Sequence, residues 1–308
     1  PTSYRTNMEY NSPRPSNILQ YREHQKELRM RIETWDPLYY GMKKLKMRGK
    51  DLSQLTGAVF SLLELEVLDL SPEREACLDF KLMEVPPAIG KLINLRILML
   101  DTNELEDIPK EIALLQSLER LALSNNHLMS LPQEFCRLKN LKSLHLANND
   151  FVHFPLPVCE LKQIEFLDLS DNSLVVLPDQ IGDLKNLHTF LLFINKIIKL
   201  PDSLCKLVEM RCLWLGKNQL RELPRKFGQL YRLDWVTRYT STNLDGNPLI
   251  HPPIEVCRLG PAAIDRYFSG LEGRSTRNKE RNQENTDREN SDPSIRNHKV
   301  HENESENY

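Results

Sequence analysis

The sequence has few of the features that mark a secreted, membrane-spanning or disulfide-stabilised protein. Its six cysteines are spread over 308 residues, too far apart for a disulfide framework. It contains no apolar signal segment, and no apolar run reaches the roughly 18 residues that a membrane-spanning helix needs. These absences favour a cytoplasmic protein without a membrane span.

Motifs for common chemistry are missing as well. The sequence has no G-x-x-x-x-G-K-[ST] loop, no H-E-x-x-H pair and no C-x-x-C pair, so nucleotide hydrolysis and zinc chemistry lack their residues. A net charge of −2 does not provide the strongly basic face of a nucleic-acid-binding protein. We therefore expect no metal, no cofactor and no nucleic-acid partner.

The sequence does contain a phrase that recurs every 23 residues, L-x-x-L-x-L-x-x-N-x-L-x-x-L-P-x-x-I-x-x-L. The seven positions that open it are Leu95, Leu118, Leu141, Ile164, Leu187, Met210 and Leu233. A unit of this length cannot bury its own apolar face, so stacked units must share one continuous core. The period therefore predicts an α/β leucine-rich repeat solenoid, with a curved parallel sheet on its concave face and short helical or 3₁₀ segments on its convex face.

Each part of the phrase has a physical reading. The L-x-L alternation predicts a short strand whose leucines point inward. The recurrent asparagine follows the strand, where buried backbone groups need hydrogen-bond partners, so we expect a ladder of asparagines. The proline of the L-P pair stops strand extension and suits a first helical turn.

The repeats extend beyond their regular part. We count about nine units in residues 42–260, with insertions near 71–80 and 237–243. Open ends need caps. Residues 16–41 predict an N-terminal capping helix in which Leu28, Ile32 and Trp35 form an apolar stripe, and residues 261–270 predict a C-terminal capping helix. Residues 1–15 are expected to be loose, and residues 271–308 to be a disordered polar tail.

The L-P-x-x-I-x-x-L limb at this period resembles intracellular leucine-rich repeat proteins of the ras-group and scribble/erbin scaffold type. The ending Leu244-Asp-Gly-Asn-Pro-Leu249, with Pro252-Pro253 and Gly260-x-x-Ala-Ile264, is similar to the terminal repeat of that group. The resemblance implies a scaffold or adaptor for intracellular signalling without chemistry of its own. The partner that it implies is a small GTPase, a kinase or a phosphatase subunit.

A binding site on such a scaffold is expected among the outward-facing residues of the concave strands, which become apolar and aromatic toward the C-terminal repeats. Exposed aromatic clusters mark interaction sites. Our candidate protein-binding residues are Phe166, Asp168, Leu191, Phe193, Ile194, Arg211, Trp214, Lys217 and Trp235. The alternative is that the two insertions or the C-terminal segment fold over these residues and make them ordinary core. Arg238 and Tyr239 of the second insertion would rim a binding site in the first case and plug it in the second.

Two further surfaces compete with this one. A secondary basic patch in the first repeat consists of Lys43, Lys44, Lys46 and Arg48. It could meet an acidic partner or lipid, although a charge run is usually a solvated face. A structural or cytoskeletal adaptor would instead use the lateral or convex faces of the solenoid. The oligomeric state stays open.

Catalysis is the least supported reading. Ser143, His145 and Asp168 lie on adjacent strands and superficially resemble a hydrolase triad. A triad also needs an oxyanion hole and a pocket that excludes water, and an open sheet supplies neither. We therefore expect no enzyme activity.

Overall fold

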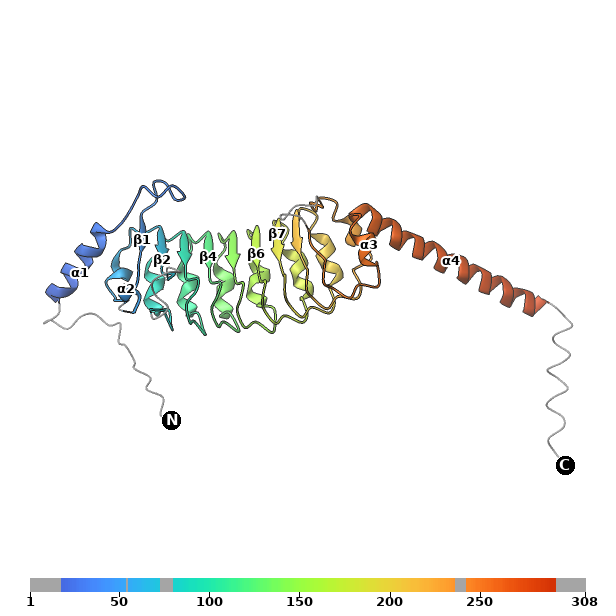
Figure 1. Ribbon diagram of the computed structural model, residues 1–308, viewed down its shortest axis with the longest axis horizontal. Coiled ribbons are helices and arrows are strands. Elements are labelled where there is room, and N and C mark those ends of the chain that lie inside the picture. The colour runs from blue at the N-terminus through green and yellow to red at the C-terminus, as the bar shows by residue number, and fades with distance from the viewer. Residues whose placement is uncertain (1–17, 54, 73–79, 236–241, 292–308) are drawn as a thin grey trace, which may run out of the picture.

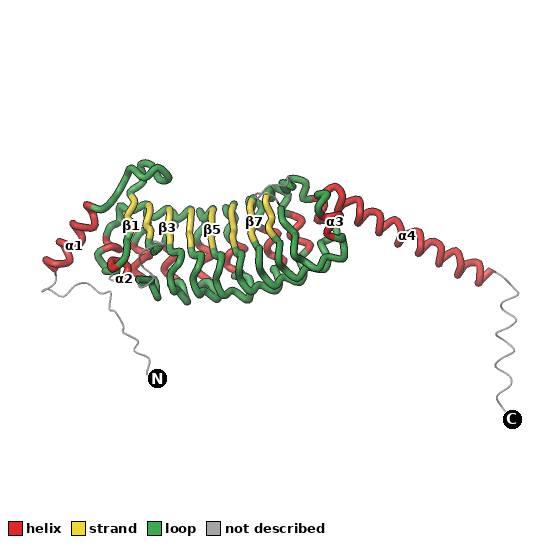
Figure 2. The backbone as a smooth tube through the Cα atoms, in the orientation of Figure 1, coloured by secondary structure: helices red, strands yellow, loops and turns green. Residues whose placement is uncertain are grey.

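The computed structural model describes residues 18–53, 55–72, 80–235 and 242–291. The chain forms one long, gently curved solenoid (Figure 1). Strands line one edge of the solenoid and short helical turns line the opposite edge, with loops joining them at every repeat (Figure 2). This arrangement confirms the predicted leucine-rich repeat solenoid.

Eight strands of three residues each form a single sheet, and their order along the sheet is their order along the chain. Every neighbouring pair is parallel. The strands are β1 (Lys44–Lys46), β2 (Val67–Asp69), β3 (Ile97–Met99), β4 (Arg120–Ala122), β5 (Ser143–His145), β6 (Phe166–Asp168), β7 (Thr189–Leu191) and β8 (Cys212–Trp214).

The register places equal positions of successive repeats side by side. Leu144 of β5 pairs with Leu167 of β6, for example, and both leucines are fully buried. In β5 to β8 the central residue is buried while its two neighbours are only partly so. The sheet therefore gives one face to the shared core and leaves the other open along the concave side.

The return limbs are short 3₁₀ helices, most of them entered from an extended proline such as Pro132 or Pro178. These helices are Val59–Ser61, Pro87–Lys91, Lys110–Leu114, Gln133–Arg137, Leu156–Glu160, Asp179–Asp183, Asp202–Lys206 and Phe227–Gln229. A four-residue α-helix, α2 (Lys50–Ser53), begins the return limb of the first repeat. The prediction of helical or 3₁₀ segments after each strand is confirmed.

The asparagine ladder also forms. Asn149 is buried, and its Nδ2 donates to the carbonyl oxygens of Leu146 (3.2 Å) and of Leu123 in the preceding repeat (3.0 Å). Its Oδ1 accepts the backbone N–H of Leu128 at 3.0 Å. Asn103, Asn126, Asn172, Asn195 and Asn218 are buried in the same way, and each bonds the preceding repeat. The ladder thus ties each of these repeats to the one before it.

The last repeat keeps this pattern despite its insertion. Asn243 takes the place beside Trp214, and Asn247 donates to the carbonyl oxygens of Leu215 (2.8 Å) and Leu244 (2.9 Å). Asn247 therefore holds the asparagine position, as the sequence predicts. Residues 73–79 of the first insertion and residues 236–241 of the second, with Arg238 and Tyr239, lie outside the described residues.

The N-terminal cap is shorter than predicted. Helix α1 (Ile18–Met30) buries Leu28, and Ile32 just beyond it packs against the core. Trp35, however, is exposed, so its predicted place in the apolar stripe is wrong. The helical spacing ends with the helix at Met30, and Pro37 disfavours helical backbone at the residue before it. Residues 33–44 instead form a loop that an antiparallel bridge between Glu33 and Lys44 closes.

The C-terminal cap is longer than predicted. After the short helix α3 (Ile254–Cys257), helix α4 (Pro261–Ser291) covers the last repeat with Ile264 and Phe268 and then projects away from the solenoid (Figure 1). Neither the expected end at residue 270 nor the expected disorder of residues 271–291 is found. The sequence has no glycine or proline between residues 274 and 292, so nothing in it ends the helix there. Residues 1–17 and 292–308 lie outside the described part of the chain.

We predict that Asn149→Ala lowers the free energy of unfolding by about 2 kcal/mol, because it leaves the buried N–H of Leu128 without an acceptor. It also removes one of the two asparagine donors from the carbonyls of Leu123 and Leu146, which keep their bonds to Asn126 and Asn172. Urea denaturation followed by circular dichroism measures the change. Asn140→Ala, which removes an exposed asparagine with one hydrogen bond to the Gln116 carbonyl, is the matched control and should change stability by about 1 kcal/mol or less. Equal effects of the two substitutions would contradict the role of the ladder.

Candidate binding surface on the concave face

The parallel register brings most of the candidate residues together. Asp168, Leu191 and Trp214 are successive partners across β6, β7 and β8. Phe166 begins a second row on the same face, followed by Thr189 and Cys212. Because neighbouring strands lie about 4.8 Å apart, side chains in such a row contact one another directly. The sequence-predicted cluster is therefore contiguous in space over these strands.

We define the concave aromatic patch as Phe166, Leu191, Phe193, Ile194 and Trp214. Ile194 is exposed and the other four are partly exposed. The rings of Phe193 and Trp214 meet edge to face, with 6.3 Å between their centroids. The ammonium of Lys217 lies over the Phe193 ring, 5.3 Å from its centroid. The patch thus joins apolar surface to a cation, and Arg211 is exposed beside it.

Ile194 holds a position that is left-handed in six successive repeats. The residue there is an asparagine or aspartate in three of them, Asn125, Asn148 and Asp171, and it is Thr102, Ile194 and Lys217 in the others. Asparagine and aspartate tolerate this conformation, whereas a β-branched residue is strained in it. Ile194 nevertheless adopts a φ of 55° with a side chain that is 38% exposed. An isoleucine that neither fills the core nor suits its backbone is typical of a functional surface.

Trp214 contributes ring surface rather than a hydrogen bond. Its Nε1 is buried, and no acceptor for it is present in the described part of the chain. A buried donor without a partner costs about 1–3 kcal/mol. Optimal folding alone does not account for a tryptophan at this position.

Trp235 differs from the rest of the candidate set in its contacts. Its partly buried ring packs against the core at the C-terminal end, where a Cβ added to Gly260 would stand 3.5 Å from the ring. Gly260 has a φ of 90°, so the backbone there approaches the ring closely in a conformation that suits glycine. Trp235 therefore helps to close the last repeat, and we do not include it in the concave aromatic patch.

Sequence reasoning missed that His145 extends the patch. Its imidazole stacks on Phe166 with 4.6 Å between the ring centroids, and its Nε2 lies 2.9 Å from the hydroxyl of Ser143. Burial, with a smaller contribution from the Arg120 guanidinium, lowers the pKa of His145 to about 4. A neutral, stacked imidazole adds aromatic area next to the patch at physiological pH.

The arrangement does not form a triad. The carboxylate of Asp168 accepts the backbone N–H of Ser170 at 2.9 Å, and burial raises its pKa. Within the described residues no hydrogen bond joins Asp168 to His145, so the imidazole lacks the group that would orient it. Ser143 and His145 do touch, but their contact stands alone on an open sheet.

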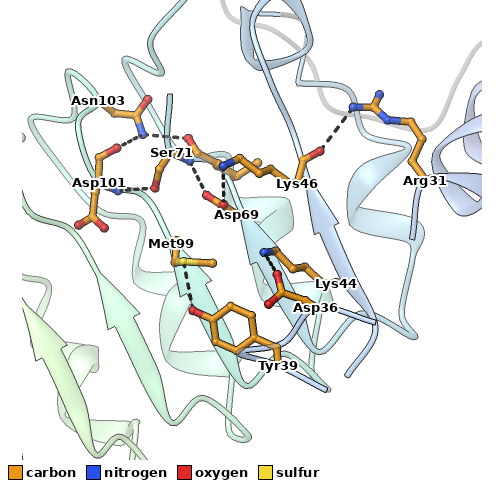
Figure 3. Close-up of polar contacts among 11 residues, drawn as sticks. Arg31, Asp36, Tyr39, Lys44, Lys46, Asp69, Ser71, Met99, Asp101 and Asn103 are labelled. Atoms are coloured by element: carbon orange, nitrogen blue, oxygen red, sulfur yellow. Dashed lines mark hydrogen bonds and ion pairs between the residues drawn. The ribbon is translucent and has the colours of Figure 1, made fainter. Parts of the chain in front are cut away.

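The basic patch of the first repeat is largely engaged in ion pairs (Figure 3). The ammonium of Lys44 lies 2.5 Å from Asp36, and that of Lys46 lies 3.3 Å from Asp69. Lys43 and Arg48 are exposed, and Arg48 has contacts of its own. The four side chains therefore do not present four free charges.

A groove of about 1060 Å³ lies on the return-limb side near α4. Leu200, Leu223 and Phe268 line it together with charged side chains of both signs, including Asp202 and Arg225. It provides a second recessed surface at the C-terminal end, away from the strands.

The helices in the described part of the chain are too short or too polar to cross a bilayer. In the same residues, no group of three or more His, Cys, Asp or Glu side chains is placed to hold a metal ion.

We predict that the His145 ring titrates near its lowered pKa of about 4, rather than at its ordinary value of 6.5, when followed by NMR in the folded protein. Between pH 4 and pH 6.5 the His145 ring is then protonated to a greater extent in the unfolded chain than in the folded protein. The contribution of neutral His145 to the free energy of unfolding is therefore present above pH 6.5 and is lost as the pH falls toward 4. Arg120→Gln removes the smaller cause and should raise the pKa in part. A folded-state midpoint near 6.5 would contradict the buried, stacked ring.

Comparison with known proteins agrees with this geometry. Residues 93–151 and residues 163–184 match two families, each described as leucine rich repeat. No curated protein matches the chain.

Several solved structures are similar. A leucine-rich repeat protein of Leptospira interrogans is 28% identical at a TM-score of 0.63, over 81% of this chain and 62% of that one. The plant peptide hormone receptor RGFR1 in complex with RGF2 is 24% identical at a TM-score of 0.53, over 67% of this chain and 31% of that one. The PEPR1–AtPEP1 structure is 25% identical at a TM-score of 0.56, over 68% and 28% of the two chains. This chain spans less than two thirds of each of these proteins. Together with the parallel sheet and the asparagine ladder, these matches show that the chain contains leucine-rich repeats and has a leucine-rich repeat fold.

Proposed function

We propose that this chain is a non-catalytic scaffold or adaptor that binds a protein partner on its concave face, in cytoplasmic signalling. The observation that carries the proposal is the concave aromatic patch. Phe166, Leu191 and Trp214 lie in register on neighbouring strands, and all members of the patch stay at least partly exposed on the concave face. Aromatic anchors of this kind dominate the binding energy of protein interfaces.

The comparisons support an interaction role in general. RGFR1, which shares the fold, is solved in complex with RGF2. At 24% identity that likeness concerns the fold alone, so it says nothing about the partner of this chain. The resemblance to ras-group and scribble/erbin scaffolds suggests the class of partner, which we propose is a small GTPase, a kinase or a phosphatase subunit.

The charges around the patch suit a partner that is itself mixed in charge. Arg211 and Lys217 are exposed at one end, and the Asp168 carboxylate lies at the other. Charged groups at the rim of an interface set its orientation and association rate more than its affinity. We therefore assign affinity to the rings and selectivity to these three side chains.

The alternative is a structural or cytoskeletal adaptor that uses the lateral or convex faces. The groove between the last return limbs and α4 favours this alternative, because its apolar floor and charged walls are available to a partner that ignores the strands. Substitutions on the concave face separate the two functions.

We predict that Phe166→Ala combined with Trp214→Ala abolishes capture of the partner, with a loss of at least about 2 kcal/mol for each hot spot. The partner is first identified from cell lysate by mass spectrometry and then titrated as a purified protein by calorimetry. Tyr231→Ala, which removes a 70% exposed ring away from the patch, is the matched control and should bind as wild type. Unchanged binding by the folded double variant would move the site to the lateral or convex faces.

We predict that Ile194→Asn weakens the same interaction and stabilises the protein. Asparagine suits the left-handed backbone that Asn125 and Asn148 adopt, so the free energy of unfolding should rise by roughly 1 kcal/mol while apolar contact area is lost. Thermal denaturation and calorimetry on one preparation measure both changes. A variant that is less stable, or that binds more tightly, would show that Ile194 serves the fold and not the partner.

A further inference from the structure

The loop between α1 and β1 alternates between side chains that face the solenoid and side chains that face away from it. We call residues 34–42 the anchored loop. Asp36 and Tyr39 point inward, whereas Trp35, Leu38 and Tyr40 are exposed. We call these three exposed side chains the apolar tip.

The inward side chains hold the loop firmly (Figure 3). The Asp36 carboxylate binds the Lys44 ammonium at 2.5 Å and accepts the Leu38 N–H at 2.8 Å, and these contacts lower the pKa of Asp36. The Lys44 ammonium also lies 5.1 Å from the centroid of the Tyr39 ring. The Tyr39 hydroxyl donates to the sulfur of Met99 on β3 at 3.8 Å.

The backbone of the loop is also closed on itself. The N–H of Gly41 donates to the carbonyl of Thr34 at 3.0 Å, and that of Met42 donates to the carbonyl of Tyr39 at 2.9 Å. Gly41 has a φ of 81°, a conformation that favours glycine and lets the chain turn back toward β1. With its base fixed in this way, the loop cannot fold its tip into the core.

The outward side chains are among the most exposed large apolar groups of the described residues. Trp35 is 77%, Leu38 82% and Tyr40 73% exposed. The two rings contact each other edge to face at 5.8 Å between centroids. With such exposed fractions the three side chains project from the loop into solvent. The hydrophobic effect disfavours such a projection in water.

The position of the loop makes the apolar tip accessible to a flat surface. The loop rises beyond the edge along which the strands lie, at the N-terminal end of the solenoid (Figures 1 and 2). A tip on a loop that rises beyond the strand edge can reach a plane without any change in the fold.

The surrounding charge is basic although the whole chain is acidic. Residues 18–50 contain nine Lys or Arg against four Asp or Glu, an excess of +5, whereas the chain as a whole carries −2. Three of these cations pair with acidic side chains outside the segment, namely Arg29 with Glu64, Arg31 with Asp51 and Lys46 with Asp69, which reduces the local excess to +2. Lys43, next to the loop, is exposed. The Asp36 carboxylate within the loop is neutralised by Lys44, and Glu33 is the acidic residue left exposed beside it.

From these observations we infer that the apolar tip is an interfacial anchor for an anionic lipid surface. Tryptophan and tyrosine prefer the boundary between headgroups and acyl chains, and leucine adds apolar area below it. Basic side chains at the base of the loop attract anionic headgroups. A lipid surface fits better than a protein pocket because the tip projects outward and the exposed Lys43 lies next to the loop. This anchor is independent of the partner proposed for the concave face.

Co-sedimentation of the full chain with vesicles tests the inference. Phosphatidylcholine vesicles with about 30% phosphatidylserine should bind wild type at least tenfold more tightly than vesicles of phosphatidylcholine alone, and salt above about 0.3 M should weaken binding. Replacement of all three tip residues, Trp35→Ser, Leu38→Ser and Tyr40→Ser, should reduce binding at least tenfold. The matched control replaces three exposed apolar residues elsewhere, namely Leu114→Ser, Met129→Ser and Val176→Ser, and should bind as wild type.

A second readout places the tip in the bilayer. Brominated lipids should quench tryptophan fluorescence in wild type, and Trp35→Phe should remove that quenching. The Phe166→Ala, Trp214→Ala double variant should still bind vesicles, which separates this site from the concave aromatic patch. The inference is overturned if wild type ignores anionic vesicles, if the tip and control variants lose binding equally, or if the tip variant loses a protein partner while vesicle binding is absent throughout.

Discussion

The bond from one asparagine amide to the carbonyls of two successive repeats is the constraint on which the rest of this structure depends. Each strand of three residues is too short to hold a sheet by itself. Asn149 fixes where its strand ends and ties that point to the preceding repeat, and the same bond recurs along the solenoid. The leucines can then stack in register, because the backbone that carries them is already aligned.

This constraint separates the side chains that build the solenoid from those that can change. Inward leucines such as Leu144 and Leu167 are fully buried and repeat with little variation. The residues between them face outward, and nothing in the fold dictates their identity. An aromatic ring such as Phe166 or Trp214 can therefore enter the concave face while the repeat keeps its register. Functional differences between solenoids of this kind arise at these free positions.

The fold and the site differed in how far the sequence could predict them. The strands, the asparagines and the 3₁₀ turns could be predicted because each occupies the same position in successive repeats. Every further repeat with the same residue types supports the same prediction. Leu191 and Trp214 could be placed together for the same reason, since the parallel register follows from the repeat. The stacking of His145 on Phe166 could not be predicted, because it depends on the rotamers of side chains in two different repeats.

Predictions failed mostly where the period ends. Trp35 has helical spacing from Leu28, but the helix stops before it, and the sequence has no second copy of that region with which to compare it. The polar composition after residue 270 indicated disorder. Composition shows only that a segment cannot bury enough apolar surface to form a core, which does not exclude a helix. A helix can continue from an anchored first turn through residues that bury nothing, provided that they favour helical backbone.

Helix α4 has a mechanical consequence. Its 31 residues span about 46 Å at 1.5 Å per residue. Its first turns are fixed to the last repeat through Ile264 and Phe268, so its direction is set by the solenoid and not by a hinge. The C-terminal end of α4 at Ser291 therefore stands at a fixed distance and direction from the repeats.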